Sequence, residues 1–257
     1  MTRDQMHSEF KFLMDKVDSS ANPLFLSQEI DKLLNISQDK FVNKRAFGNN
    51  VRRTSFEEDQ KRRDDLRTLI SRIRINNQDI EGLTQGFIPN SATFTLPSSG
   101  TFSGGYRHSI MEEALIIPSS SFLEGTQFGT NIIGEQIPLQ GDDVNQIRVS
   151  VKPITHDRYT KIMDDPFNKP EKNSVYRLDS SDEDYNKQVI LIHSKDTVVS
   201  QYILHYIREP LSISSGQDCI LPNHTHREIV RMAVVEALEG IESPRYQSSK
   251  IELNEIE

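Results

Sequence analysis

The spacing of hydrophobic residues predicts three helices in the first 75 residues. The first carries apolar residues at intervals of three and four, as one buried helix face requires: Met6, Phe10, Leu13, Met14 and Val17. A second helix is capped by Ser27 and ends at Phe47-Gly48-Asn49-Asn50. Its buried side is formed by Ile30, Leu33, Leu34, Ile36 and Phe41. The third runs from the capping box of Ser55 and Glu58 to about Arg72. Its apolar side is formed by Leu66, Leu69, Ile70 and Ile73.

The period changes from about Gly86, where alternating and β-branched segments predict strands. These segments are residues 93–96, 147–151, 189–193 and 198–207. A short helix is expected over Thr155 to Met163. Residues 98–105 and 165–170 are rich in Gly, Ser or Pro, so we expect both to be loops or arms that reach outward.

A last amphipathic helix is predicted near the end of the chain. Pro222-Asn223 provides its start, Thr225 and Glu228 can form a capping box, and Ser243-Pro244 ends it. Its apolar stripe consists of Ile229, Val230, Ala233, Val234, Ala237, Leu238 and Ile241.

These elements predict an α+β fold in which the N-terminal helices and the C-terminal helix form a helical bundle, with an inserted β-rich region and extended arms. The expected organisation has four parts. They are an N-terminal helical region (1–85), a β-rich region with loops and arms (86–221), a C-terminal helix packing on the N-terminal helices (222–244), and a tail (245–257).

The composition indicates a thin core. Hydrophobic residues make up 35% of the 257 residues, and the mean hydropathy is −0.56. Ordinary globular chains contain about 45–50% apolar residues, glycine included. Such a chain is either partly extended or buries surface against other chains.

Apolar runs are far shorter than the roughly 20 residues that span a bilayer, and the start of the chain has no apolar signal segment. We therefore expect no membrane contact and synthesis in a host cytoplasm, which the single cysteine also suits.

The charge is unevenly distributed. The net charge is −8. Residues 1–80 contain 15 Lys and Arg against 13 Asp and Glu, a balance of +2, which leaves −10 for the rest. Ten basic and five acidic residues lie between Lys44 and Arg74. A solvated helix face with mixed charges is the favoured interpretation, and a nucleic-acid contact is the alternative.

Candidate catalytic and metal-binding residues do not form a recognisable site. His224 and His226 are two positions apart and have no further ligand at metal spacing. Residues 179–184 are acidic but lack the glycine and the twelfth-position glutamate of a calcium loop. Cys219 has no basic partner nearby in the sequence and is interpreted as structural. No nucleotide-binding, hydrolase or kinase motif is present, so we expect no enzyme activity, no metal and no cofactor.

Several ordered blocks resemble those of virion structural proteins from crAss-like and related tailed bacteriophages of Bacteroidetes. At the N-terminal end they are Leu13-Met-Asp-Lys-Val-Asp-Ser, Pro23-Leu-Phe-Leu, Glu29-Ile-Asp, Leu34-Asn, Phe41-Val-Asn-Lys-Arg and Phe56-Glu-Glu-Asp-Gln-Lys-Arg-Arg-Asp-Asp-Leu. Further along they are Asp165-Pro-Phe-Asn-Lys-Pro, Tyr206-Ile-Arg-Glu-Pro, Leu221-Pro-Asn-His-Thr-His-Arg-Glu-Ile-Val and Ile241-Glu-Ser-Pro-Arg-Tyr-Gln. The chain has Arg45-Ala-Phe where the family has Arg-Tyr, and residues 86–145 match no motif.

The resemblance implies a head-to-tail connector: a non-enzymatic ring protein below the portal that lines the conduit for genome ejection. Expected partners are twelve copies of the chain in a closed ring, the portal protein, adjacent tail rings, and genomic DNA that passes without sequence-specific binding. The candidate interface or DNA-facing residues are Arg45, Arg52, Arg53, Arg62, Arg63, Arg245 and Tyr246. Two alternatives are a DNA-binding virion protein that uses the basic helix 44–74, and a hydrolase that breaches the host envelope, for which no catalytic constellation can be assembled.

Overall fold

The computed structural model divides the chain into two compact units, Met1–Ile70 with Glu209–Glu257, and Ser71–Arg208. The residues that it describes are 1–15, 25–47, 59–77, 88–98, 105–118, 128–130, 136–138, 146–165, 167–182, 185–241 and 250–251. The predicted arm at 98–105 and the tail at 245–257 lie mostly outside these residues.

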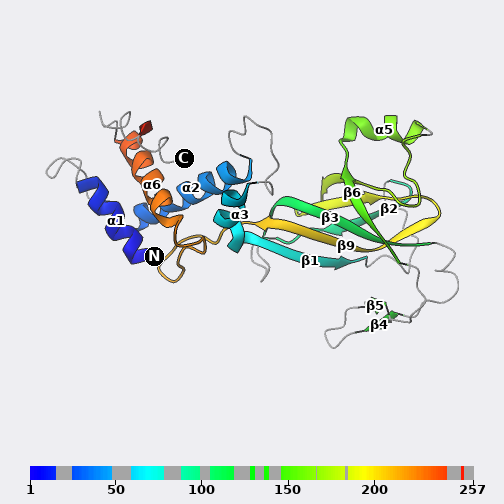
Figure 1. Cartoon of the computed structure of the whole chain (residues 1–257), viewed down its shortest axis with the longest axis horizontal. Coiled ribbons are helices and arrows are strands. Elements are labelled where there is room, and N and C mark those ends of the chain that lie inside the picture. Colours follow the sequence, from blue (N-terminus) through cyan, green and yellow to red (C-terminus); the bar gives the residue numbers. More distant parts are fainter. Residues whose placement is uncertain are drawn as a thin grey trace. The chain divides into compact units, whose positions relative to one another are not determined.

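The first unit is helical (Figure 1). Its helices are α1 (Arg3–Asp15), α2 (Ser27–Ala46), α3 (Gln60–Leu66) and α6 (His226–Gly240). Helix α6 contacts both α1 and α2. The residues between them with no exposed surface include Met6, Phe10, Ile30, Leu34, Phe41, Ile229, Val230, Ala233 and Leu238. The hydrophobic stripes predicted for these three helices are therefore confirmed in their central residues. Leu13, Leu33, Ile36 and Ile241 are only partly buried, and Val17 lies outside the described residues.

The starts of α2 and α6 differ from the predicted caps. The carboxylate of Glu29 accepts a hydrogen bond from the backbone N–H of Leu26 at 2.8 Å, so α2 is capped from its third position and not by Ser27. At α6, the Thr225 hydroxyl donates to the carbonyl of Pro222 at 2.9 Å and makes no cap hydrogen bond. Glu228 binds Arg45, so a tertiary ion pair replaces the predicted capping box.

The third predicted helix is too long. Helix α3 ends at Leu66, a 3₁₀ turn covers Arg67–Leu69, and strand β1 (Ile70–Asn76) follows. Residues 70–75 fit a helical spacing, but they also alternate with a period of two. Ile73 and Ile75 pack against the core of the sheet, and pairing with a neighbouring strand outweighs helix propensity. The predicted capping box at Ser55 lies outside the described residues, and Asp59 caps α3 by accepting from the Lys61 N–H.

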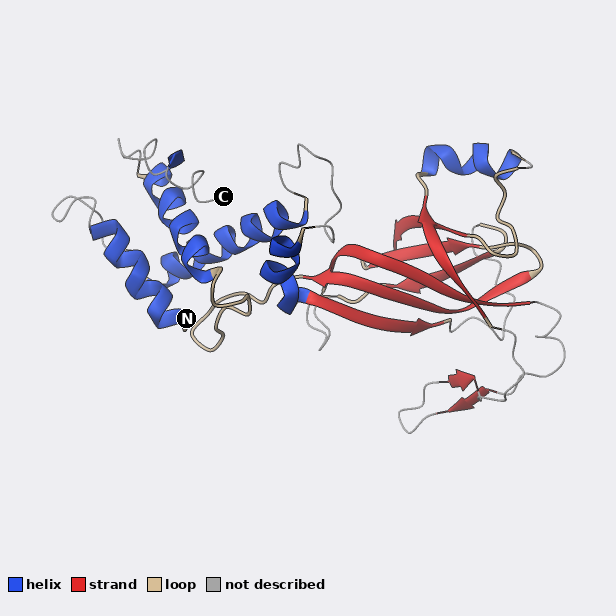
Figure 2. Ribbon diagram, viewed as in Figure 1, coloured by secondary structure: helices blue, strands red, loops and turns tan. Residues whose placement is uncertain are grey.

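The second unit is built on a seven-stranded curled sheet, a half-barrel (Figure 2). Besides β1, its strands are β2 (Ser91–Thr95), β3 (Tyr106–Pro118), β6 (Ile147–Pro153), β7 (Val175–Ser181), β8 (Lys187–Ile192) and β9 (Thr197–Arg208). The order is β1-β9-β3-β6-β7-β8-β2, and β6 and β7 are parallel. The strands β4 (Phe128–Thr130) and β5 (Gln136–Pro138) pair separately. Helix α5 (His156–Asp164) connects β6 to β7.

The structure corrects the predicted fold class. The chain is a mixed α/β protein with a large curled sheet, and it is not a helical bundle with a β insertion. The four predicted strands and the short helix exist, with ends shifted by one or two residues. Strand β3 was not predicted because Glu112 and Glu113 interrupt its apolar residues. It nevertheless forms the longest strand pair in the unit, with β9.

The core of the sheet lies on one face of β3 and β9. Alternate residues of these strands, among them Ala114, Ile116, Tyr202, Leu204 and Tyr206, belong to one buried cluster. The opposite face of β9 is buried as well at Ile203 and Ile207. Strand β9 is therefore covered on both sides, which explains its continuous apolar sequence.

The turn between β7 and β8 holds Tyr185 in the left-handed backbone region. Its φ is 62°, and its side chain is 91% exposed. Asp182 fixes the turn, because its carboxylate accepts hydrogen bonds from the backbone and side-chain amides of Asn186, both at 3.0 Å. A residue with a Cβ is strained at this φ, and asparagine tolerates the region best after glycine.

We expect Tyr185→Asn to raise the free energy of unfolding by about 1 kcal/mol, because it relieves this strain. Urea unfolding followed by circular dichroism measures the change. Tyr185→Phe keeps the same backbone cost and should leave the value unchanged. A Tyr185→Asn variant no more stable than the parent chain would contradict the assignment of strain.

Candidate interaction surfaces

The predicted basic segment contributes one arginine to a buried ion-pair network in the helical unit. Arg45 on α2 places Nε 2.8 Å from Oδ2 of Asp65 on α3, and Nη2 2.9 Å from both oxygens of Glu228 on α6. The side chains of Arg45 and Asp65 are only 10% and 4% exposed. The guanidinium also lies 5.0 Å from the centre of the Phe41 ring. Arg45 is thus bound inside its own unit, where it joins three helices.

Of the other predicted site residues, the structure describes Arg62 and Arg63, both on α3. The Arg62 side chain is 17% exposed, with Nε 3.5 Å from Asp59, the residue that caps α3, while Arg63 is exposed. Lys61 and Arg67 are exposed beside it. The remaining candidates lie outside the described residues: Arg52, Arg53, Arg245 and Tyr246.

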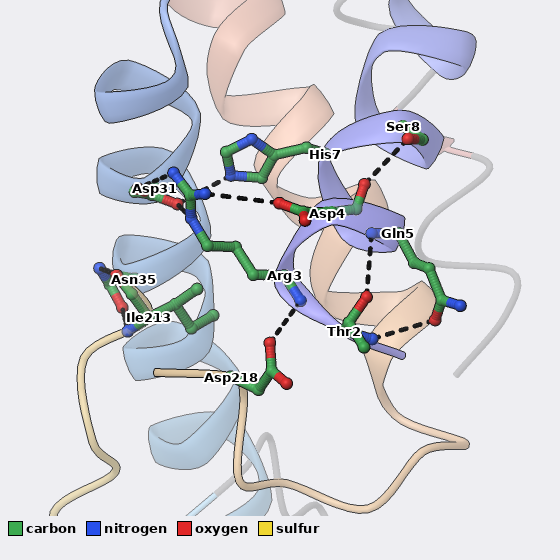
Figure 3. Close-up of polar contacts among 10 residues, drawn as sticks. All are labelled: Thr2, Arg3, Asp4, Gln5, His7, Ser8, Asp31, Asn35, Ile213 and Asp218. Carbon is green, nitrogen blue, oxygen red and sulfur yellow. Dashed lines mark hydrogen bonds and ion pairs between the residues drawn. The ribbon is translucent and has the colours of Figure 1, made fainter. Parts of the chain in front are cut away.

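A second polar network ties α1 to α2 and to the segment before α6 (Figure 3). Arg3 donates through Nε and Nη2 to the two carboxylate oxygens of Asp31, each at 2.8 Å, and His7 Nε2 lies 2.8 Å from Oδ1. The Arg3 backbone N–H donates to Asp218 at 2.7 Å. The hydrogen bond from Arg3, supported by that from His7, lowers the pKa of Asp31 below its ordinary value. This network stabilises the fold, and sequence spacing could not reveal it because Arg3 and Asp218 are 215 residues apart.

His224 and His226, the two histidines considered as metal ligands, bind different partners. His224 Nε2 lies 2.9 Å from Asp65, whereas His226 Nε2 lies 2.7 Å from the carbonyl oxygen of Leu221. Among the residues that the structure describes, no group of three or more His, Cys, Asp or Glu is arranged to hold a metal ion. Cys219 is buried and donates through Sγ to Gln38 at 3.3 Å, and burial raises the pKa of its thiol.

His226 makes stability depend on pH. Burial lowers the pKa of its imidazole below the ordinary value of about 6.5, and the α-ammonium group of Met1 lies 2.9 Å from Nδ1. The unfolded chain therefore takes up a proton at a higher pH than the folded chain. The free energy of unfolding therefore falls as the pH decreases through 6.5.

We expect His226→Gln to flatten the dependence of the unfolding free energy on pH between 7 and 5, because glutamine does not titrate. Chemical unfolding at a series of pH values measures the slope. Thr160→Ser, at an exposed residue of α5 that does not titrate, provides the control for substitution itself and should leave the slope unchanged. Equal slopes for His226→Gln and the parent chain would contradict this role of His226.

The sheet contains a buried charge cluster of its own. Arg177 on β7 forms an ion pair with Glu112 on β3, and its Nε lies 3.2 Å from Asp179. The hydroxyl of Tyr202 donates to the other oxygen of Glu112 at 3.0 Å. Burial and the neighbouring Glu112 carboxylate raise the pKa of Tyr202, so this hydroxyl remains protonated. The cluster neutralises a glutamate that the strand alternation points into the core.

The segment between β6 and β7 forms a projecting surface of the sheet unit. We call residues 154–174 the β6–β7 insert; it contains α5 and the turn that Asp165 begins. Helix α5 has no buried residue. The Asp165 carboxylate accepts hydrogen bonds from the Phe167 N–H at 2.9 Å and from the Asn168 side chain at 2.6 Å. The Phe167 side chain is 89% exposed. The insert thus presents a large aromatic residue on an ordered turn.

Comparison with known proteins identifies the family. Residues 108–245, more than half of the chain, match the family model of phage tail ring protein 3/4 of crAss-like phages. The chain has no match among curated proteins. Within the part of the chain that the structure describes, no helix is both long and apolar enough to cross a membrane. The family resemblance seen in the sequence is confirmed. This chain therefore belongs to the phage tail ring protein 3/4 family and is a structural protein of a bacteriophage tail.

Proposed function

We propose that this chain forms a closed ring of twelve copies in the phage neck, as a head-to-tail connector below the portal protein. The observation that carries the proposal is the family match over residues 108–245. In a ring, each copy uses two different lateral faces, and further surfaces contact the layers above and below. Burial between copies also accounts for a chain with 35% hydrophobic residues.

The ring would line the conduit through which the genome leaves the particle. The net charge of −8 suits a wall that DNA passes without strong binding, because contacts between basic side chains and phosphates would slow its passage. A DNA-binding role for residues 44–74 is less favoured, because Arg45 is already bound to Asp65 and Glu228. We propose a purely structural role after synthesis in the host cytoplasm.

Electron cryomicroscopy of purified particles tests the proposal. The expected result is a closed twelve-fold ring of this chain on the tail axis, between the portal and the next tail layer. A location away from the axis would contradict the connector role. Duplex-DNA binding by the purified chain at low salt gives a separate test, in which tight and salt-dependent binding would support the DNA-binding alternative.

A further inference from the structure

We propose that the β6–β7 insert docks on a second copy of this chain in the ring, with Phe167 as the anchoring side chain. This inference rests on the proposed ring and adds to it the lateral contact. The insert lies within the segment that matches the ring-protein family.

Helix α5 lacks the packing that a short helix needs. It has nine residues, and isolated helices shorter than about 12 residues are marginal in water. Tyr159, Ile162 and Met163 form an apolar stripe at helical spacing, yet each is only half-buried. Figure 1 shows α5 at the end of the two segments that join it to β6 and β7. A partner that covered this stripe would supply the missing burial.

The turn after α5 holds Phe167 in place before any partner binds. Besides the two hydrogen bonds to the Asp165 carboxylate, the backbone N–H groups of Asn168 and Lys169 donate to the Asp165 carbonyl at 3.3 and 3.2 Å. The hydroxyl of Tyr176, on β7, donates to the Asn168 carbonyl at 2.9 Å. His156 Nε2, at the other end of the insert, lies 2.8 Å from the Asp179 carbonyl oxygen, also on β7. An anchor ordered in this way loses little conformational entropy on docking.

The charge of the insert favours a second copy as the partner. The insert contains four acidic residues (Asp157, Asp164, Asp165, Glu171) and four basic residues (Arg158, Lys161, Lys169, Lys172), so its net charge is zero. The whole chain carries −8. A neutral surface can approach another copy of an acidic chain without the repulsion that two acidic surfaces would experience. The absence of a basic excess also disfavours DNA as the occupant.

Self-association of the purified full-length chain tests the docking. Sedimentation velocity over a concentration series should show that Phe167→Ala weakens association about tenfold or more, since a buried aromatic anchor contributes strongly to an interface. Because Phe167 is 89% exposed, the unfolding temperature of the Phe167→Ala variant should equal that of the parent chain. Tyr185→Asn removes an equally exposed aromatic from a turn outside the insert and should leave association unaltered.

A photo-crosslinking experiment identifies the partner directly. Phe167→p-benzoylphenylalanine in the full-length chain is expected to give covalent dimers on irradiation, with the crosslinked peptide from a second copy. Normal ring formation by Phe167→Ala, together with no crosslink from the p-benzoylphenylalanine variant, would overturn the docking proposal and leave the ring intact. A wild-type chain that stays monomeric at the highest concentration reached would overturn it as well. If particles nevertheless show the ring on the tail axis, the connector role stands without this contact.

Discussion

Replacing Arg45 with alanine is expected to lower the free energy of unfolding of the helical unit by about 3–5 kcal/mol. The substitution leaves Asp65 and Glu228 without their cation, and the Asp65 side chain is only 4% exposed. A buried carboxylate that loses its partner keeps the full cost of its removal from water. The loss of contact with the Phe41 ring adds to the effect.

Far-ultraviolet circular dichroism during urea unfolding measures this loss, and it suits a chain without tryptophan. Arg63→Ala provides the matched control, because Arg63 is exposed on α3 and should change stability by less than about 0.5 kcal/mol. Arg45→Met keeps most of the side-chain volume but not the charge, so it should remain nearly as destabilising as alanine. A loss below about 1 kcal/mol for either variant would show that Asp65 and Glu228 find other partners.

Arg177→Ala is expected to destabilise the sheet unit by about 3 kcal/mol. Its removal leaves Glu112, whose side chain is 9% exposed, with the Tyr202 hydroxyl as its remaining partner in the cluster. The hydrogen bond from one neutral donor does not offset the free-energy cost of removing a carboxylate from water. Thermal or urea unfolding monitored in the β-sheet region of the circular dichroism spectrum measures the change.

The same sheet offers a control at an exposed ion pair. Arg148 lies 3.6 Å from Glu113, but its side chain is 54% exposed, so Arg148→Ala should cost less than about 1 kcal/mol. The double variant Glu112→Leu with Arg177→Met replaces both charges by apolar groups and is expected to recover most of the loss. If Arg177→Ala and Arg148→Ala lower the free energy of unfolding equally, the burial of the Arg177 cluster does not determine its contribution to stability.

Much of the local structure follows from the sequence. The spacing of apolar residues in α1, α2 and α6 is long and regular, so burial of one face requires a helix there. Strand β9 is dominated by β-branched and aromatic residues, which favour an extended chain. The prediction was wrong at residues 70–72, which it placed in the third helix, because a short isoleucine-rich segment fits both periods and only its pairing partner distinguishes them.

The sequence identified Arg45 as a candidate interaction residue, but it could not show that its charge pairs with carboxylates of the same chain. Its partners Asp65 and Glu228 are 20 and 183 residues away. The sequence also predicted that the Asp165–Pro170 segment is a loop or arm that reaches outward. It gave no sign that Asp165 orders the turn or that Phe167 is left exposed, because both properties depend on hydrogen bonds and burial in the folded chain.

By itself, the sequence determined the helical faces, four strands of the sheet, the acidic charge and the family to which this chain belongs, since each depends on local pattern or composition. Only the tertiary structure decided the mixed α/β class, the inward orientation of Glu112 and the pairing of Arg45 within its own unit. The physical reason is that strand pairing and ion pairing join residues far apart in the chain, and their free energies outweigh local propensity where the partners meet out of water.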